Sequence, residues 1–434
     1  WLEGQFRFSK ESFSISLHLG LVSPVSPGAY SAHMVFAKVY AASLLVAIAR
    51  GDIASSGLEQ ASLGEAPANT ALPAIAVRLV RSTRILGGLS FFVGRVAVGD
   101  DERQHFEVLF DTASGNVILP SSSCTSSVCV EHHRYQHQKS SEVGEEWEIE
   151  FSQMELGSGV ASGPVVRDRL CVGRMLGQQE ARGRAACAED LHFVASKNMT
   201  DVPFRAMPHD GIVGLGLQGL WVGPKSGFLD QLVSSIHGLL PQYSLSFGRD
   251  EGELRFGGYD PTRLTAPLEW FPVANEDEGF WQVWMRAVRI GNHTIDFCST
   301  GCRAIIDTGA SGLAVPKVLL PRLRAALAPS SVAGGGCKGP DLHLDLGSST
   351  ALKLRAEDYA GPSCQPQLVP LDIPEQRFAN VFVFGVNVLR PYYTVFDWGA
   401  KRIGFSRVSG RFVRISDSER PDAIGGMALG TLMV

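Results

Sequence analysis

The sequence lacks every common arrangement for a catalytic metal, a bound nucleotide or an activated serine. It has no H-E-x-x-H, no C-x-x-C pair, no G-x-x-x-x-G-K-[ST] phosphate loop and no G-x-S-x-G turn. The histidine-rich stretch His132–His137 lies among polar residues, so we expect a solvated loop there and not a metal site. These absences argue against zinc and serine hydrolases, and we expect no metal and no organic cofactor.

Charge and long apolar runs are also scarce. Only 19% of the 434 residues are charged, the net charge is −5, and the basic residues are scattered along the chain, so nucleic acid is not an expected partner. The apolar run Val39–Ile48 and the tail GGMALGTLMV are too short to predict a stable membrane span. With 45% hydrophobic residues, the length suits two domains or one two-lobed unit.

The N-terminal region has the three-part layout of a secretory signal peptide. The first methionine, Met34, is followed by Lys38, the apolar run and a small-x-small site at Ala47-Ile48-Ala49. A short buried helix is the alternative, but no helical stripe of polar residues occurs there. We therefore expect residues 34–49 to be a signal peptide and residues 1–33 to be an upstream extension outside the native protein.

The cysteines are even in number and fit an oxidising compartment. Cys124 and Cys129 enclose four residues, and Cys298 and Cys302 enclose three. The remaining four form plausible local pairs, Cys171 with Cys187 and Cys337 with Cys364, and disulfides are favoured over zinc in a secreted chain. Two glycosylation sequons begin at Asn198 and Asn292 and fit the same compartment.

One pattern occurs twice in the chain. VLFDTASGNVILP (Val108–Pro120) and AIIDTGASGLAVP (Ala304–Pro316) both run from an apolar triplet through Asp-Thr and small residues to an apolar run and proline. Each copy is followed by apolar residues that end in glycine, in GIVGLG (211–216) and VFVFGVN (381–387). Two similar lobes that each contribute one carboxylate, Asp111 and Asp307, predict a site at the interface between them.

The remainder predicts a mostly-β fold. Strand-like runs with Gly, Asp or Asn turns occupy residues 147–156, 244–258, 280–291 and 392–408. Helical spacing of apolar residues is confined to residues 228–240 and 316–328, which we expect to be small peripheral helices.

Paired carboxylates provide acid–base chemistry. Two of them held about 3 Å apart cannot both ionise, so they share a proton, and one can activate water while the other protonates a substrate carbonyl. Thr112 and Thr308 are suited to holding the two turns, and the small neighbours leave room for water. A lone Asp-Thr-small motif more often caps a turn, but two copies in matching contexts disfavour that interpretation.

From about residue 75 to residue 410 the chain resembles the pepsin-like aspartic proteases. The resemblance rests on the two acid motifs, on FWQV (280–283) before FCSTGC, and on YYTVFD (392–397). It implies two β-barrel-like lobes, 88–264 and 265–412, that face each other across a cleft, with a tail at 413–434. It also implies the disulfides Cys124–Cys129, Cys298–Cys302 and Cys337–Cys364, with Cys171–Cys187 as an additional one.

The resemblance further implies a zymogen whose propeptide covers residues 50–87. LPAIAVRLVRSTR (72–84) resembles the basic propeptide that covers such clefts, with arginines that pair with the acids at neutral pH and release them on acidification. We accordingly expect a monomer that acts on proteins or peptides at acidic pH, prefers hydrophobic residues around the cut, and is secreted or delivered to a vacuolar or lysosome-like compartment.

Two departures from the family pattern lie beside the acids. Ala113 stands where glycine is usual, whereas the second motif keeps Gly309. Ala310 replaces a hydroxyl residue that often supports the second acid, and Ser114 keeps it on the first side. We expect the methyl group of Ala113 to crowd the site and the loss of a hydroxyl at position 310 to raise the pKa of Asp307.

A third departure lies in the flap, the hairpin that closes over substrate in this family. Leu156-Gly157-Ser158 stands where a tyrosine-glycine start is usual, and Ile118 stands where the tyrosine's tryptophan partner is expected. We hypothesise that Leu156 and Ile118 pack directly; a shifted register with Phe151 in the tyrosine's role is the alternative.

Two functions fit these observations. The first is an aspartic-type endopeptidase that cleaves through water held between Asp111 and Asp307. The second is a catalytically weak or inactive pepsin-like peptide-binding protein. Ala113 and the aliphatic flap favour the second, whereas both acids, Ser114 and the basic pro-segment favour the first.

Overall fold

The computed structural model describes residues 72–82, 89, 91–99, 104–137, 141–153, 155–176, 185–347, 351–373, 375 and 378–409. All of them belong to the second of two compact units, Asn69–Val434. The expected upstream extension, signal peptide, C-terminal tail and most of the propeptide lie outside the described residues. Within the described part of the chain, no helix is long and apolar enough to cross a membrane.

The fold is mostly β, as predicted, and its largest sheet contains the first repeat. The order along this sheet is β13-β26-β25-β11-β12-β1-β2-β3-β10-β4-β8-β6-β5, with β7 and β9 paired at its side. These strands are β1 (Ala74–Arg81), β2 (Phe92–Val98), β3 (Gln104–Asp111), β4 (Val117–Pro120), β5 (Glu142–Gln153), β6 (Gly157–Val172), β7 (Arg174–Leu176), β8 (Ala186–Ser196), β9 (Asn198–Met199), β10 (Gly211–Gly214), β11 (Gln242–Phe247), β12 (Glu251–Phe256), β13 (Glu269–Pro272), β25 (Tyr392–Asp397) and β26 (Arg402–Arg407).

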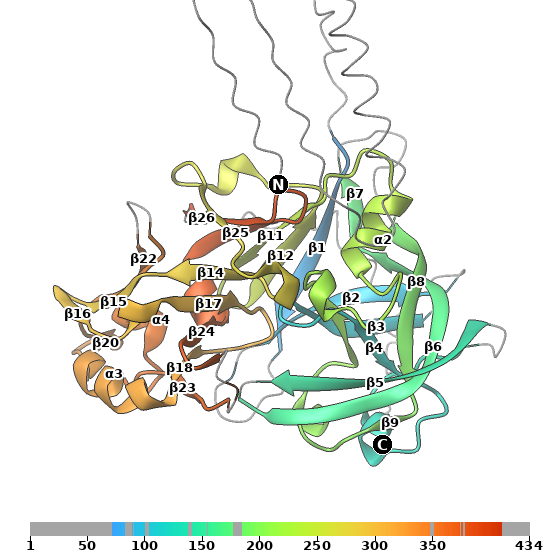
Figure 1. Cartoon of the computed structure of the whole chain (residues 1–434), viewed down its shortest axis with the longest axis horizontal. Coiled ribbons are helices and arrows are strands. Elements are labelled where there is room, and N and C mark those ends of the chain that lie inside the picture. The colour runs from blue at the N-terminus through green and yellow to red at the C-terminus, as the bar shows by residue number, and fades with distance from the viewer. Residues whose placement is uncertain are drawn as a thin grey trace, which may run out of the picture. The chain divides into compact units, whose positions relative to one another are not determined.

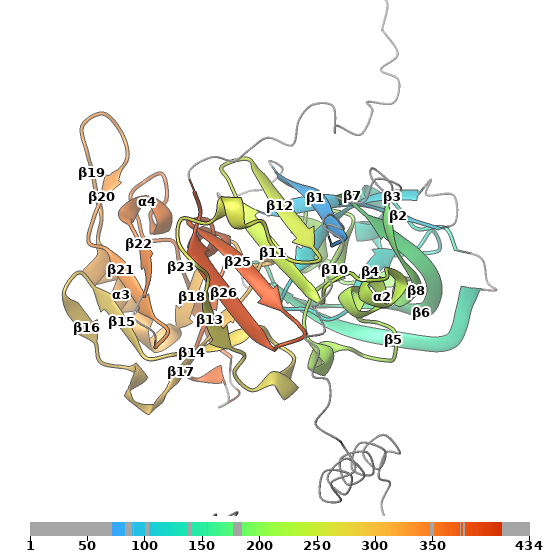
Figure 2. The same cartoon turned by 90° about the horizontal axis from the view of Figure 1, so that it is seen from above.

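The second repeat lies in a separate five-stranded sheet, with the order β14-β17-β24-β18-β23. Its strands are β14 (Gln282–Met285), β17 (Cys302–Ile306), β18 (Leu313–Pro316), β23 (Leu368–Leu371) and β24 (Val381–Phe384). A smaller sheet joins β15 (Ala287–Ile290), β16 (His293–Ile295), β21 (Leu342–Asp345) and β22 (Leu352–Leu354), and β19 (Ser330–Ser331) pairs with β20 (Cys337–Lys338). The two repeats lie on opposite sides of β11, β12, β25 and β26, which gives the bilobal pepsin-like fold (Figures 1 and 2).

The repeated pattern folds the same way twice. β3 runs parallel to β10, which is antiparallel to β4, and β17 runs parallel to β24, which is antiparallel to β18. A side chain at Gly214 would lie 2.4 Å from the amide nitrogen of Asn116, and one at Gly385 would lie 2.3 Å from the carbonyl oxygen of Gly312. The glycine that ends each second strand therefore permits the close approach expected from the sequence.

The helices are shorter than predicted. α2 spans Phe228–Ser235 and α3 spans Leu320–Leu327, and the first buries one apolar face, as its spacing indicated. α2 ends early because Ile236 is extended and Gly238 turns with φ +79°. Residues 317–319 form a 3-10 turn, and the proline in the first turn of α3 suits a helix start. The other α-helices in the described part of the chain are α4 (Ala356–Tyr359) and α5 (Val386–Leu389).

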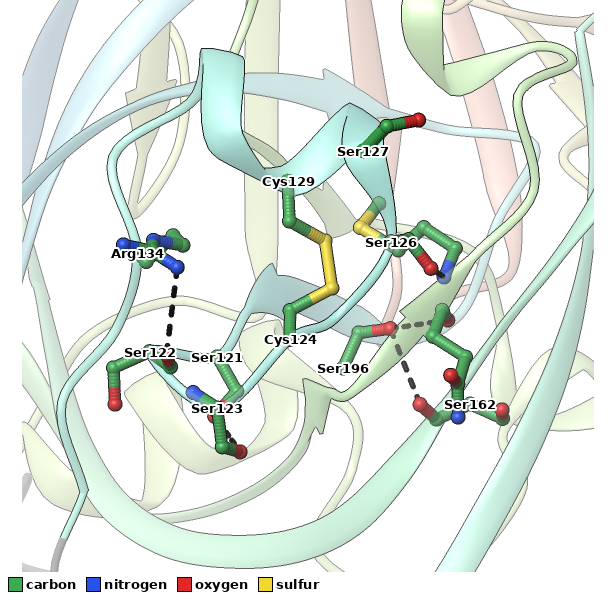
Figure 3. Close-up of a disulfide and its surroundings, with 12 residues drawn as sticks. Ser121, Ser122, Ser123, Cys124, Ser126, Ser127, Cys129, Arg134, Ser162 and Ser196 are labelled. Carbon is green, nitrogen blue, oxygen red and sulfur yellow. Dashed lines mark hydrogen bonds between the residues drawn. A yellow bond between two sulfur atoms is a disulfide. The ribbon is translucent and has the colours of Figure 1, made fainter.

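All four expected disulfides are present: Cys124–Cys129, Cys171–Cys187, Cys298–Cys302 and Cys337–Cys364. The first closes the loop that follows β4, beside Ser196, whose hydroxyl donates to the carbonyl oxygens of Ser162 and Asn198 (Figure 3). Cys124 and Cys129 lie in the same buried cluster as Ile118 and Phe151, so this disulfide loop supports the part of the β5–β6 hairpin near its tip.

The basic segment 72–84 does not cover the two aspartates in its described part. Residues 74–81 form β1, which pairs with β12 on one side and with β2 and β7 on the other. Arg78 pairs with Glu251, and Arg81 approaches Asp250 at 4.0 Å. The expectation that these two arginines pair with the catalytic acids is therefore wrong for this structure. The alternating apolar side chains of Ile75, Val77 and Leu79 are buried and make the segment a core strand. Arg84 lies outside the described residues.

The histidine-rich stretch is also more buried than expected. Tyr135 is fully buried, and the side chains of His132 and His137 are only 10% and 7% exposed. His132 and His133 face Asp210, and His137 contacts Glu142. The prediction of a solvated loop holds for the exposed His133, Arg134 and Gln136, whereas His132, Tyr135 and His137 anchor the loop. No cluster of potential metal ligands occurs among the described residues.

Candidate active site

Asp111 and Asp307 meet, although they lie in different repeats. Asp111 is the last residue of β3, and Asp307 directly follows β17. The backbone of each is held by the later segment of its own repeat: the carbonyl oxygen of Asp111 accepts from the amide of Leu215 at 2.7 Å, and the amide of Asp307 donates to the carbonyl oxygen of Phe384 at 3.1 Å. The residues are only 3% and 7% exposed, and their carboxyl groups lie close together, since a Cβ at Gly309 would be 2.8 Å from Asp111 Oδ1 and 3.1 Å from Asp307 Oδ1. The structure thus brings together the two residues that the repeated pattern singled out.

The turn after each acid aims backbone N–H groups at its carboxylate. Ala113 donates to Asp111 Oδ1 at 2.8 Å. Gly309 and Ala310 donate to Asp307 Oδ1 at 2.7 and 3.1 Å. These bonds orient the two carboxylates toward each other, which general acid–base catalysis requires.

Thr112 and Thr308 tie the two turns together in a reciprocal pattern. Each threonine amide donates to the other's hydroxyl oxygen, at 3.1 and 3.0 Å. Each hydroxyl in turn donates to a carbonyl of the opposite strand, that of Ile306 at 2.7 Å and that of Phe110 at 2.6 Å. Both threonines are buried, so this network fixes the separation of the acids.

The surroundings raise the pKa of both acids. Burial raises the pKa of Asp111, and the amide of Ala113, Ser114 and Asp307 oppose that rise. Burial raises the pKa of Asp307 well above its ordinary value, with the charges of Asp111 and Glu155 adding to that rise and the amide of Gly309 opposing it. Both carboxyl groups therefore hold a proton more readily than an isolated aspartate does, as expected of two acids that share one proton.

The small residues beside the acids differ between the two turns. A Cβ at Gly309 would lie 2.8 Å from Asp111 Oδ1 and 3.1 Å from Asp307 Oδ1, so glycine is required there. Ala113 carries that methyl group in the first turn and packs against the cluster that contains Ala310. Ser114 Oγ lies near enough to Asp111 to lower the pKa of that acid, but it makes no hydrogen bond of ordinary geometry and is buried.

The flap is the β5–β6 hairpin, which reaches from the first lobe towards β18 and β23 (Figure 1). Leu156 packs against the buried cluster that contains Ile118 and Phe151. Leu156 and Phe151, the two candidates for the position of the family's flap tyrosine, therefore lie in one apolar group. Gly157 turns the chain with φ +101°, and the hydroxyls of Ser158 and Ser152 are 2.7 Å apart. Direct packing of Leu156 on Ile118 stays a prediction.

Two residues at the flap tip were missed from the sequence. Gln153 Nε2 donates to the carbonyl oxygen of Gly309 at 3.2 Å. Glu155 Oε1 accepts from the amides of Ser311 and Gly312 at 2.9 and 2.8 Å. Both contacts cross from the first lobe to the turn of Asp307. The hairpin is rich in polar residues throughout, so no distinct signal in the sequence marked these two, whose partners lie more than 150 residues away.

The predicted glycosylation sites are accessible. Asn198 and Asn292 are both exposed, the first in β9 and the second in the turn between β15 and β16. Their exposure permits modification, which stays a prediction.

Comparison with known proteins defines the class. The family model for eukaryotic aspartyl protease matches residues 91–408, and the chain belongs to that family. It is an aspartic-type endopeptidase, with peptides as its substrates.

Several curated relatives resemble the chain over most of its length. Cathepsin E-B of Xenopus laevis is 31% identical over 336 residues, which cover 73% of this chain and 79% of the relative. Cathepsin E of Mus musculus is 28% identical over the same shares, and cathepsin D of Clupea harengus is 29% identical over 73% of this chain and 81% of its own. These relatives and the four disulfides indicate a secretory or lysosomal compartment.

Proposed function

We propose that Asp111 and Asp307 are the catalytic pair of this endopeptidase. The observation that carries the proposal is a buried pair of neighbouring carboxyl groups on two turns that Thr112 and Thr308 tie together. One shared proton is the behaviour already known for aspartic proteases as a class. The different surroundings of the two acids support a role for Asp111 as base and for Asp307 as acid.

The reaction then needs no covalent intermediate. Asp111 takes a proton from water, whose oxygen attacks the peptide carbonyl carbon, while Asp307 gives its proton to the carbonyl oxygen. In the second step a hydroxyl of the tetrahedral intermediate returns a proton to Asp307, the C–N bond breaks, and the proton on Asp111 passes to the leaving amine. The pair ends as it began, with one proton on Asp307.

Substitution of each acid tests these roles. Asp111→Asn and Asp307→Asn remove the base and the acid without changing side-chain shape, so we expect each to lower kcat by at least about 10³-fold. Acidified protein is assayed on a mixed peptide pool by mass spectrometry, with Glu150→Gln on the exposed face of the flap as control. Wild-type turnover retained by Asp111→Asn would show that the pair is not catalytic.

The second candidate function is peptide binding with little or no cleavage. Ala113 favours it, because the equivalent Cβ at Gly309 would collide with the carboxylates. A wild-type protein that binds a statine-containing peptide inhibitor but cleaves nothing, even after acidification, would support this candidate. Cleavage of any peptide that Asp111→Asn leaves intact would refute it.

We also propose that the enzyme is made as a zymogen, with the pro-segment upstream of residue 88, and that it works as a monomer. Both acids and both threonines come from one chain, which supports the monomer. The pairing of β1 on both sides implies that cleavage after Arg81 would leave this strand bound in the sheet. Mass spectrometry of the acidified protein under native and denaturing conditions tests whether the cleaved strand stays bound. A native mass without residues 74–81 would show that it is released.

A further inference from the structure

The flap tip makes an unusual polar contact with the opposite lobe. Glu155 Oε1 lies 2.9 and 2.8 Å from two successive backbone amides, those of Ser311 and Gly312. A carboxylate held by two N–H groups makes stronger hydrogen bonds than a neutral acceptor would. This contact therefore closes the flap with more than apolar packing alone.

Gln153 adds a second tie and holds the first in place. Its side-chain oxygen accepts from the amides of Glu155 and Leu156, at 2.9 and 2.6 Å, which shapes the turn. Its nitrogen donates both to Glu155 and to the carbonyl oxygen of Gly309. Gln153 is only 3% exposed, so the pair is built into the closed hairpin and is not a surface contact.

The groups that these side chains engage belong to the turn of Asp307. Gly309 is the residue whose amide orients that acid, and Ser311 and Gly312 continue the turn into β18. A peptide whose carbonyl reaches the acids has to pass beside this turn. At Gly309, Ser311 and Gly312 the flap side chains lie at hydrogen-bond distance from the turn, which leaves no space for a peptide between them.

We propose that Glu155 and Gln153 form a latch that closes the flap on the Asp307 turn in the free enzyme, and that substrate binds by displacing it. The proposal rests on the proposed function, since it makes the latch an internal competitor of the peptide substrate. Glu155 is thereby a residue that sets substrate affinity, and it takes no part in bond breaking.

The latch has an electrostatic consequence that a packing role would not produce. The charge of Glu155 helps to raise the pKa of Asp307. Its removal should lower that pKa, so that the shared proton is lost at a lower pH. The basic limb of the pH profile of kcat/KM, which reports the free enzyme, should then move to lower pH.

The test compares Glu155→Ala and Glu155→Gln with Glu150→Ala, an exposed position on the same strand. With an uncharged peptide, we expect Glu155→Ala to lower KM by about 3- to 30-fold while kcat stays within about twofold, because charge-assisted hydrogen bonds no longer have to be broken. The KM of Glu155→Gln should lie between those of Glu155→Ala and the wild type. Both substitutions should move the basic limb of the pH profile of kcat/KM to lower pH. Glu150→Ala should match the wild type in all three respects.

Hydrogen exchange provides a readout without turnover. In the segment 309–316, we expect the amides of Ser311 and Gly312 to exchange about tenfold faster in Glu155→Ala than in the wild type and Glu150→Ala. If no variant cleaves peptides, the proposed function fails, and exchange together with calorimetric binding of a statine-containing peptide still decides the latch. A higher KM or weaker inhibitor binding in Glu155→Ala, or unchanged exchange, would overturn the latch.

Discussion

At the scale of single residues, the turns of Asp111 and Asp307 differ by one methyl group. A Cβ added at Gly309 would lie 2.8 Å from Asp111 Oδ1, and the amide of Ala113 keeps that carboxylate from moving away. We expect Gly309→Ala to lower kcat by about 10²-fold or more, since a misplacement near 1 Å can cost that much. Steady-state kinetics on one peptide, together with a circular dichroism spectrum to confirm folding, measure this.

Ala113→Gly is the matched change in the other turn. It removes the methyl group from the first turn and leaves the hydrogen bond from residue 113 to Asp111 available, since that bond uses the backbone. We expect kcat to rise by about 2- to 10-fold with KM little changed, because removal of the methyl group makes space beside the carboxylates and leaves the rest of the substrate site unchanged. A lower kcat would mean that Ala113 is an adapted part of this site.

The residues that carry chemistry were predictable to the extent that the sequence repeats them. Asp111 and Asp307 stood out because their whole apolar context occurs twice, and the same repetition identified Gly214 and Gly385. Gln153 and Glu155 occur once, in a turn that resembles any polar hairpin tip. Their role depends on where the hairpin lies in three dimensions, which no local pattern encodes.

At the scale of elements, Thr308 joins β3 to the turn after β17. Its hydroxyl accepts from the amide of Thr112 and donates to the carbonyl of Phe110, so Thr308→Val leaves two buried polar groups unpaired. We expect a loss of about 2 to 4 kcal/mol in the free energy of unfolding, measured by urea denaturation. Thr308→Ser keeps the hydroxyl and should cost much less; equal losses would show that the methyl group matters and the hydrogen bonds do not.

The flap hairpin packs near its tip on the apolar cluster that contains Ile118 and Phe151. If Leu156 packs on Ile118, a double-mutant cycle of Leu156→Ala and Ile118→Ala should give a coupling of about 0.5 kcal/mol or more in the free energy of unfolding. The parallel cycle of Leu156→Ala with Phe151→Ala is the control, because Phe151 lies in the same cluster. Coupling to Phe151 alone would support the shifted register instead.

Strands were predicted well where the local sequence pattern determines them, and less well where contacts with other parts of the fold do. The strands at 244–258 and 392–408 formed as β11 with β12 and as β25 with β26, because strand-forming residues there are interrupted by short turns that contain Gly or Asp. The basic segment 72–84 was interpreted from its arginines, whereas its alternating Ile75, Val77 and Leu79 decided its place in the core. Burial of these side chains outweighs ion pairs that are largely exposed.

At the scale of the whole molecule, two buried aspartates respond to pH in opposite ways. Burial on its own would raise the pKa of Asp210, but His132, the amides of Glu107 and His133, and the His133 ring together lower it to about 2. The pKa of Asp307 is instead raised well above its ordinary value by burial and by Asp111 and Glu155. Asp210 thus stabilises the fold as an anion, whereas Asp307 is tolerated as a neutral acid.

The sign of each effect on stability follows from proton uptake. Asp210 binds its proton less readily in the folded state, so its contribution is complete above pH ~4 and is lost as the pH falls towards 2. Asp307 binds its proton more readily in the folded state, so its ionisation destabilises the fold progressively as the pH rises above ~4. The protein should therefore be most stable in mildly acidic solution, which suits a lysosome-like compartment.

Two substitutions separate these contributions, each serving as the control for the other. Asp210→Asn should lower the free energy of unfolding by about 1 to 2 kcal/mol at pH 5, because the hydrogen bonds that hold the Asp210 carboxylate weaken, and this loss should shrink as the pH approaches 2. Asp307→Asn should become more stable relative to the wild type between pH 4 and pH 6, because it cannot ionise. Chemical denaturation at matched pH values measures both, and parallel pH slopes in the two variants would contradict the assignment of the shared proton to Asp307.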